Sequence, residues 1–85
     1  MEITFELKKE FIDNTSLIQN VRVLYKKRKI VEGKPAVITH DPFEVTIYNL
    51  DNKDDDNTSH IIDFESAVEI ALIFSDESIK VFKDE

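Results

Sequence analysis

The chain has 85 residues, with 18 acidic and 11 basic side chains and a formal net charge of −7. This length fits one domain, spanning 1–85. The sequence contains no Cys, which excludes disulfide scaffolds, thiolate metal sites and a cysteine nucleophile. Its single Gly excludes the glycine-rich loops that cradle phosphates.

The pattern of the N-terminal half predicts mainly strands. Residues 2–8 alternate between apolar and polar side chains, which predicts a half-buried strand. The short polar residues 13–16 predict a turn. Val21, Val23 and Tyr25 alternate in a stretch rich in β-branched residues, so we expect a long strand over 20–31. Residues 17–31 also allow a helix, because Leu17, Val21 and Leu24 have helical spacing.

Turn residues divide the centre of the chain. The run Glu32-Gly33-Lys34-Pro35 predicts a hairpin turn. The Asp41-Pro42 dipeptide interrupts the apolar segment that follows, which predicts either two strands, 36–40 and 43–50, or one bent strand. Residues 51–59 are uninterrupted polar residues, and we expect them to form an exposed acidic loop.

The C-terminal third contains the strongest helix pattern. Apolar residues at i, i+3, i+4, i+7 and i+8 predict a helix near 63–75, with Asp63 as its N-cap. A strand through Val68, Ile70, Leu72 and Phe74 is the alternative. A short strand is expected over 78–83. The predicted fold class is therefore α+β: a small, mostly antiparallel sheet of about four to five strands packed against one helix.

No catalytic set can be assembled from the sequence. His40 and His60 each lack a suitably spaced partner, so we expect neither an enzyme nor a cofactor. The oxygen-bearing residues of 54–65 resemble the calcium loop of the EF-hand. The match fails at Ser59, where that loop needs Gly, so a solvated loop is favoured and no metal site is predicted.

Charge is distributed unevenly along the chain. Residues 1–34 carry five acids and eight bases, whereas residues 35–85 carry thirteen acids and three bases. The run Lys26–Lys29 could form a phosphate patch, although on a strand its side chains would divide between two faces. The acidic balance argues against nucleic acid binding by the whole surface, and no membrane-spanning stretch is present. We expect a cytoplasmic protein, in the host cytoplasm if the chain is phage-encoded.

The composition is similar to that of small acidic inhibitors, such as phage-encoded anti-CRISPR-like proteins and DNA mimics. This resemblance implies a non-enzymatic protein that blocks the basic nucleic-acid groove of a host defence nuclease. A small structural or regulatory homodimer is the alternative. The residues expected to contact the partner are acidic: Asp54, Asp55, Asp56, Glu65, Glu69, Asp76 and Glu77.

Overall fold

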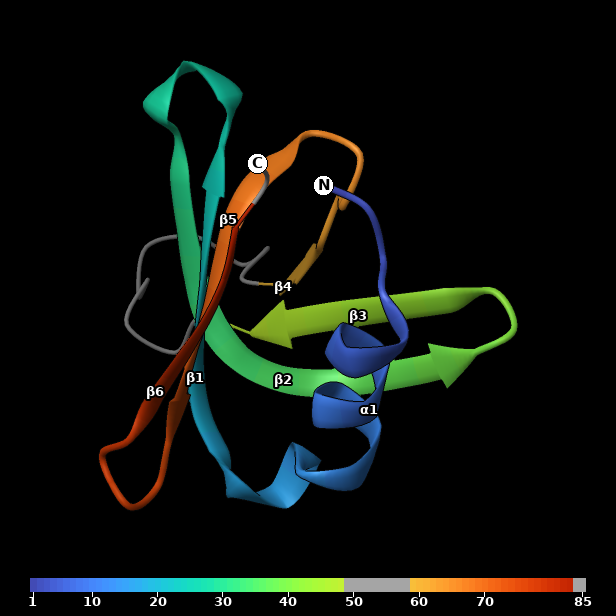
Figure 1. The fold of residues 1–85 in the computed structure, drawn as a ribbon, viewed down its shortest axis with the longest axis vertical. Helices are drawn as coiled ribbons and strands as arrows, with labels where there is room; N and C mark the ends of the chain where they lie inside the picture. The colour runs from blue at the N-terminus through green and yellow to red at the C-terminus, as the bar shows by residue number, and fades with distance from the viewer. Residues whose placement is uncertain (49–58, 84–85) are drawn as a thin grey trace.

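In the residues that the structure describes, one antiparallel sheet of six strands and one α-helix make up the fold (Figure 1). The structure, a computed structural model, describes residues 1–48 and 59–83. The strand order across the sheet is β4-β3-β2-β1-β5-β6. In chain order the elements are α1 (Phe5–Asp13), η1 (Thr15–Leu17), β1 (Ile18–Tyr25), η2 (Lys26–Arg28), β2 (Ile30–His40), β3 (Phe43–Tyr48), β4 (Ser59–Ile61), β5 (Ala67–Phe74) and β6 (Ile79–Lys83).

The predicted N-terminal strand over 2–8 is wrong, because a helix begins there. The hydroxyl of Thr4 accepts a hydrogen bond from the backbone N–H of Leu7 at 3.2 Å, which is an N-cap. Leu7 and Phe11, one helical turn apart, are the buried residues of α1. The alternation that suggested a strand depended on Phe5, and its side chain is 80% exposed. Helical spacing of the two core residues therefore outweighs the local alternation.

The first hairpin turns earlier than predicted. Residues 26–28 form the turn between β1 and β2, whereas the predicted turn at 32–35 lies within β2. Val21, Val23 and Tyr25 alternate toward the core as expected, but their strand ends at Tyr25. The sequence signal was misleading because Gly33 has another role: a Cβ there would lie 2.9 Å from the backbone of Tyr48. Glycine allows β2 to approach the end of β3 this closely.

The second hairpin confirms the break predicted at Asp41-Pro42. This peptide bond is cis and lies between β2 and β3, so the two-strand interpretation of this segment is correct. The register of β2 on β3 shifts between Pro35 and Val37, close to Gly33. Figure 1 shows β2 bending through this region, so that its first part pairs with β1 and its second part with β3.

The helix predicted over 63–75 is wrong, and the alternative strand is correct. Residues 67–74 form β5, which pairs with β1 on one side and β6 on the other. Ile70 and Leu72 face the core, while Ala71 and Ile73 occupy the opposite face. Apolar residues on both faces of an interior strand reproduce helical spacing by coincidence. The predicted last strand is confirmed as β6.

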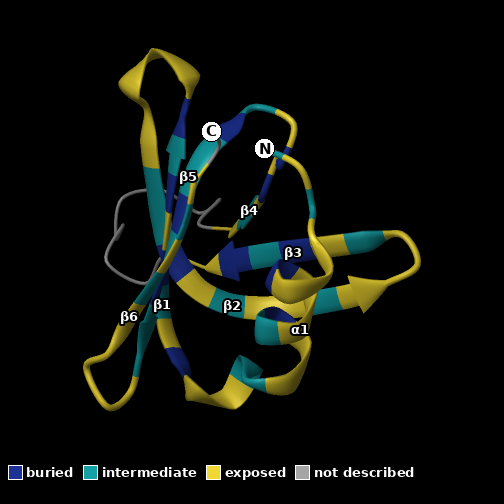
Figure 2. Cartoon of the chain, viewed as in Figure 1, coloured by how far each residue is buried: buried dark blue, intermediate teal, exposed yellow. Residues whose placement is uncertain are grey.

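The core lies between α1 and the concave face of the bent sheet (Figure 2). Phe11 contributes a ring that packs edge-on to Phe64, with centroids 6.4 Å apart, and lies 6.2 Å from the ring of Phe43. Lys80 of β6 also holds α1 in place, because its Nζ lies 2.9 Å from a carboxylate oxygen of Glu10. This contact lowers the pKa of Glu10 and raises that of Lys80. The described residues therefore pack as one small domain.

Candidate functional site

The four described members of the predicted acidic set are not gathered in one place. Glu65 and Glu69 lie before and near the start of β5, whereas Asp76 and Glu77 lie in the turn after it. The eight residues of β5 span about 26 Å, at ~3.3 Å per residue. The other three members lie outside the described residues: Asp54, Asp55 and Asp56. The rest of the predicted acidic loop is also outside them, except for Ser59, which begins β4.

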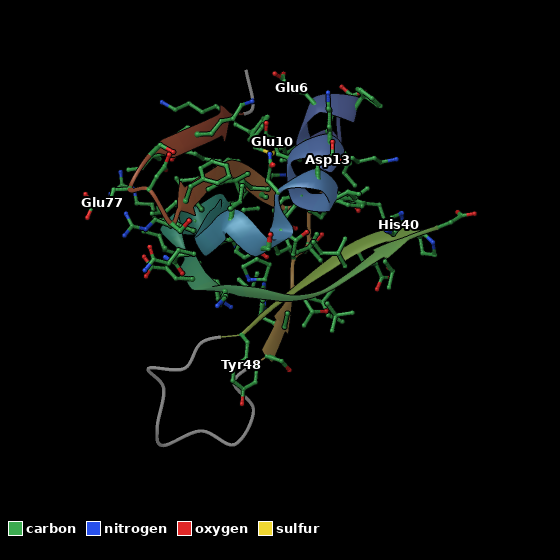
Figure 3. All side chains as sticks on the ribbon, turned by 90° about the horizontal axis from the view of Figure 1, so that it is seen from below. Glu6, Glu10, Asp13, His40, Tyr48 and Glu77 are labelled. Carbon is green, nitrogen blue, oxygen red and sulfur yellow. The ribbon has the colours of Figure 1, made fainter. Side chains whose placement is uncertain are left out.

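Two of these acids already have partners within the molecule. A carboxylate oxygen of Glu69 lies 3.6 Å from Lys83 Nζ on the neighbouring strand. The Asp76 carboxylate accepts hydrogen bonds from the hydroxyl and the backbone N–H of Ser78, at 2.5 and 3.0 Å, which lowers its pKa. Figure 3 shows Glu77 at the left edge of the view, apart from Glu6 and Asp13 of α1 near its middle. The described acids therefore form no single negative face.

Large apolar side chains are instead concentrated on the outer face of the sheet, which is the face turned away from α1. The cross-strand pairs Leu24↔Ile30 and Ala71↔Val81 lie on this face, because the residues flanking them in β1 and β5 point to the core. Six of the nine exposed large hydrophobic residues belong to the outer face: Ile30, Val37, Tyr48, Ile61, Ile79 and Val81. Because β2 bends, these residues fall into two groups: Ile30, Ile79 and Val81 lie on the side of β1, β5 and β6, and Val37, Tyr48 and Ile61 on the side of β3 and β4. Exposed apolar residues that are neighbours, such as Ile79 and Val81, are candidates for contact with a protein.

Charged pairs lie among these apolar residues. Arg22 and Glu32 face each other across β1 and β2, with Nε and Oε1 2.5 Å apart. The Glu69–Lys83 pair lies across β5 and β6 on the same face. The outer face therefore carries charged pairs between its apolar side chains, one of them on the central strands β1 and β2.

A cluster of four cations occupies the turn of the first hairpin; we call Lys26, Lys27, Arg28 and Lys29 the basic tip. All four residues are exposed. Lys27 and Arg28 have positive φ angles of 68° and 63°, a conformation that residues other than Gly and Asn rarely adopt. None of the four side chains forms an ion pair with another residue in 1–48 or 59–83.

A tyrosine–histidine pair lies at the base of the basic tip. The hydroxyl of Tyr25 lies 2.6 Å from His60 Nε2 and accepts a hydrogen bond from the N–H of Asp63 at 3.1 Å. Since the hydroxyl accepts from Asp63, its own proton is available to Nε2 of a neutral His60. Burial, followed by the charge of Lys29, lowers the pKa of His60, while Asp63 opposes this shift. Burial raises the pKa of Tyr25.

Potential metal ligands are not clustered at this pair. Among residues 1–48 and 59–83, no group of three or more His, Cys, Asp or Glu side chains could hold a metal ion. His60 and Ile61 of the calcium-like pattern pair with β3 as part of β4, so they lie in a strand rather than a loop, and residues 62–65 follow that strand. His40 lies at the other end of β3, opposite Phe43. The two histidines therefore do not share a site.

Sequence reasoning singled out the basic tip but placed it within a strand. One signal could have placed a turn there: apolar residues stop alternating between Tyr25 and Ile30, and the four consecutive cations between them are not side chains that pack in a core. The outer apolar face was missed, because it depends on which strands are neighbours. His60 was noted, but its bond to Tyr25 joins residues 35 positions apart.

No helix in the described part of the chain is long and apolar enough to cross a membrane. A search of known proteins returned no matching family model, curated protein or solved structure.

Proposed function

We propose that the protein functions by binding another protein, without catalysis, through the outer face of its sheet. The observation that carries this proposal is the set of large apolar residues left exposed on the sheet face that α1 does not cover. Ile79 is 63% exposed and Val81 is 45% exposed, and they are neighbours on the edge strand β6. Burying such side chains against a partner contributes about 25 cal/mol per Å² of apolar surface.

The charge of the chain indicates the chemistry of the partner. A net charge of −7 favours association with a basic protein and speeds the encounter. A nuclease with a basic groove that holds nucleic acid is such a partner, and a phage-encoded inhibitor of a host defence enzyme would act by occupying it. The acidic run Asp54–Asp56 is the part of the chain best suited to replace phosphates there, because it places three carboxylates on consecutive residues.

Self-association is the second candidate, and the edge position of β6 favours it. An edge strand exposes unpaired backbone groups that a second copy can extend into a continuous sheet. The apolar pair Ile79 and Val81 would then meet the same pair of the second copy. Light scattering distinguishes this candidate from a foreign partner, because it needs only the purified protein.

The test is affinity capture from the native cell with tagged protein, followed by mass spectrometry. The double variant Ile79→Thr/Val81→Thr keeps residues that suit a strand, so its melting temperature should stay close to that of the wild type. We expect it to lose the captured partner, or to become monomeric if the partner is a second copy. The matched control is Phe5→Ser, which removes an exposed apolar side chain from α1. Equal capture by both variants would contradict the proposal.

The role of charge is tested separately with Asp54→Asn/Asp55→Asn/Asp56→Asn. If these carboxylates contact a basic groove, affinity for the captured partner should fall about tenfold or more, which is ~1.4 kcal/mol spread over three partly exposed pairs. Wild-type affinity should also fall as salt rises. An affinity that is insensitive both to this variant and to salt would rule out the nucleic-acid-mimic mechanism and leave the apolar face as the contact.

A further inference from the structure

The fold does not depend on the positive charge of the basic tip. Its contacts to the rest of the described molecule are made by backbone atoms: the N–H of Tyr25 donates to the carbonyl of Lys29 at 2.7 Å, and the N–H of Lys26 donates to the carbonyl of Ser66 at 3.2 Å. Any residue with a backbone N–H could make these bonds. The side chains of the tip are exposed, so the core does not select their identity.

The residues of the basic tip are unfavourable for the turn they form. Lys27 and Arg28 both have left-handed φ angles, where a Cβ is costly and where Asn and Gly are the usual residues of a hairpin turn. Four like charges on consecutive residues also repel each other. A sequence selected for stability alone would not combine these two disadvantages. Backbone strain and unpaired charge kept together in one exposed turn indicate a binding role.

We propose that the basic tip binds the phosphate backbone of duplex nucleic acid. Arg and Lys side chains are the usual phosphate ligands. A two-stranded β-ribbon is one of the two elements that the major groove of B-DNA admits. Figure 1 shows the tip of the β1–β2 hairpin projecting beyond the neighbouring strands, as such an element must.

The residue that precedes the basic tip is held in place by burial and hydrogen bonds. Tyr25, directly before it, is only 7% exposed, and its hydroxyl is bound to His60 and Asp63. The four cations therefore follow directly on a fixed residue, which reduces the entropy lost on binding.

The net charge of the chain limits this interaction without preventing it. At physiological ionic strength, charges more than about 8 Å apart are largely screened. The tip therefore presents a local positive field although the chain as a whole is acidic. Glu65 lies near the base of the tip, next to Ser66, but it forms no ion pair with the four cations. We expect weak binding without sequence preference, since contacts to phosphates carry no base information. This inference is independent of the proposed protein-binding function. A partner protein that holds nucleic acid would nevertheless allow both contacts at once, protein with the outer face and nucleic acid with the basic tip.

The test measures binding of a fluorescently labelled 24-base-pair DNA duplex by anisotropy, over a series of salt concentrations from 20 to 200 mM. If all four cations meet phosphates, the slope of log affinity against log salt should be roughly −3.6, at ~0.9 per contact. Lys27→Gln/Arg28→Gln should halve this slope and weaken binding roughly 60-fold at 0.1 M salt, if affinities converge near 1 M. The matched control is Lys9→Gln/Lys34→Gln, which removes two exposed charges elsewhere and should leave the slope unchanged.

A second variant separates binding from folding. Lys27→Asn/Arg28→Gly removes the same two charges but places residues there that tolerate a left-handed turn. We expect it to lose binding to the same extent while its melting temperature rises by about 4–8 °C above that of the Gln variant. Loss of binding cannot then be attributed to unfolding.

Three results would overturn the proposal. The first is no binding of the duplex by the wild type at 20 mM salt. The second is an equal loss of binding in the Lys9/Lys34 control. The third is tighter binding to vesicles containing phosphatidylserine than to the duplex, at matched phosphate concentration, which would assign the tip to a membrane surface instead.

Discussion

Replacing Tyr25 by Phe should destabilise the fold by about 2 kcal/mol. The change deletes one oxygen atom, which accepts a hydrogen bond from the Asp63 N–H at 3.1 Å and lies 2.6 Å from His60 Nε2. The ring remains in place, so the loss of packing is small. Each of the two lost hydrogen bonds contributes ~1 kcal/mol, and both bonds are partly shielded from solvent, which makes their loss costly. The melting temperature should fall by about 8–16 °C.

Thermal and urea unfolding, followed by circular dichroism at pH 7.5, measure this effect. The slope of free energy against urea should not change, because the surface exposed on unfolding is the same. Tyr48→Phe is the matched control: Tyr48 is 42% exposed, and its hydroxyl has no hydrogen-bond partner among the residues that the structure describes. That variant should stay within ~0.5 kcal/mol of the wild type. If Tyr25→Phe also stays within this range, the hydroxyl does not anchor β4 to β1 and our reading of this contact is incorrect.

Two further predictions concern pH and the bend of β2. Since folding lowers the pKa of His60, the contribution of this residue to stability should be complete above pH ~6.5 and should be lost as pH falls below that value. Urea midpoints measured between pH 7.5 and 5 should show this loss in the wild type and in His40→Gln. They should not show it in His60→Gln. Identical pH profiles for the two variants would exclude His60 as the source. Gly33→Ala places a Cβ 2.9 Å from the backbone of Tyr48 and should cost about 1–3 kcal/mol in the same urea assay, whereas Lys34→Ala should change stability by less than ~0.5 kcal/mol. Wild-type stability in Gly33→Ala would show that β2 can shift away from β3.

Local signals in the sequence predicted some elements well. The Asp41-Pro42 break and the last strand follow from the backbone limits of proline and from alternation, and both are present. Residue types that suit more than one structural role gave wrong predictions. Gly33 suggested a turn, but the fold uses its missing side chain for a close approach between strands. The real turn has no Gly or Pro, so no rule of turn chemistry could locate it at Lys26–Arg28.

The site residues depend on strand order, which the sequence does not display. Tyr25 and His60 meet because β1 and β4 both border the core, although neither strand pairs with the other. The outer apolar face requires that β5 lie between β1 and β6, and the expected helix over 63–75 concealed that arrangement. Residues of the predicted acidic set were identified by charge alone, which carries no information about their separation in space.

The pairing of β5 with β1 has a consequence for how the chain folds. The other strand pairs of the sheet join segments that are adjacent in the order of elements, whereas the β1–β5 pairing connects residues such as Tyr25 and Ala67. Forming the β1–β5 pairing closes a long loop, which costs conformational entropy. This cost precedes the favourable free energy of packing the β5–β6 hairpin against β1. We therefore place this closure late in the folding reaction and expect it to limit the rate. The cost grows only logarithmically, so doubling the length of the closed loop would add just ~0.6 kcal/mol. The chain can thus accept insertions between β3 and β4 with little change in how fast it folds.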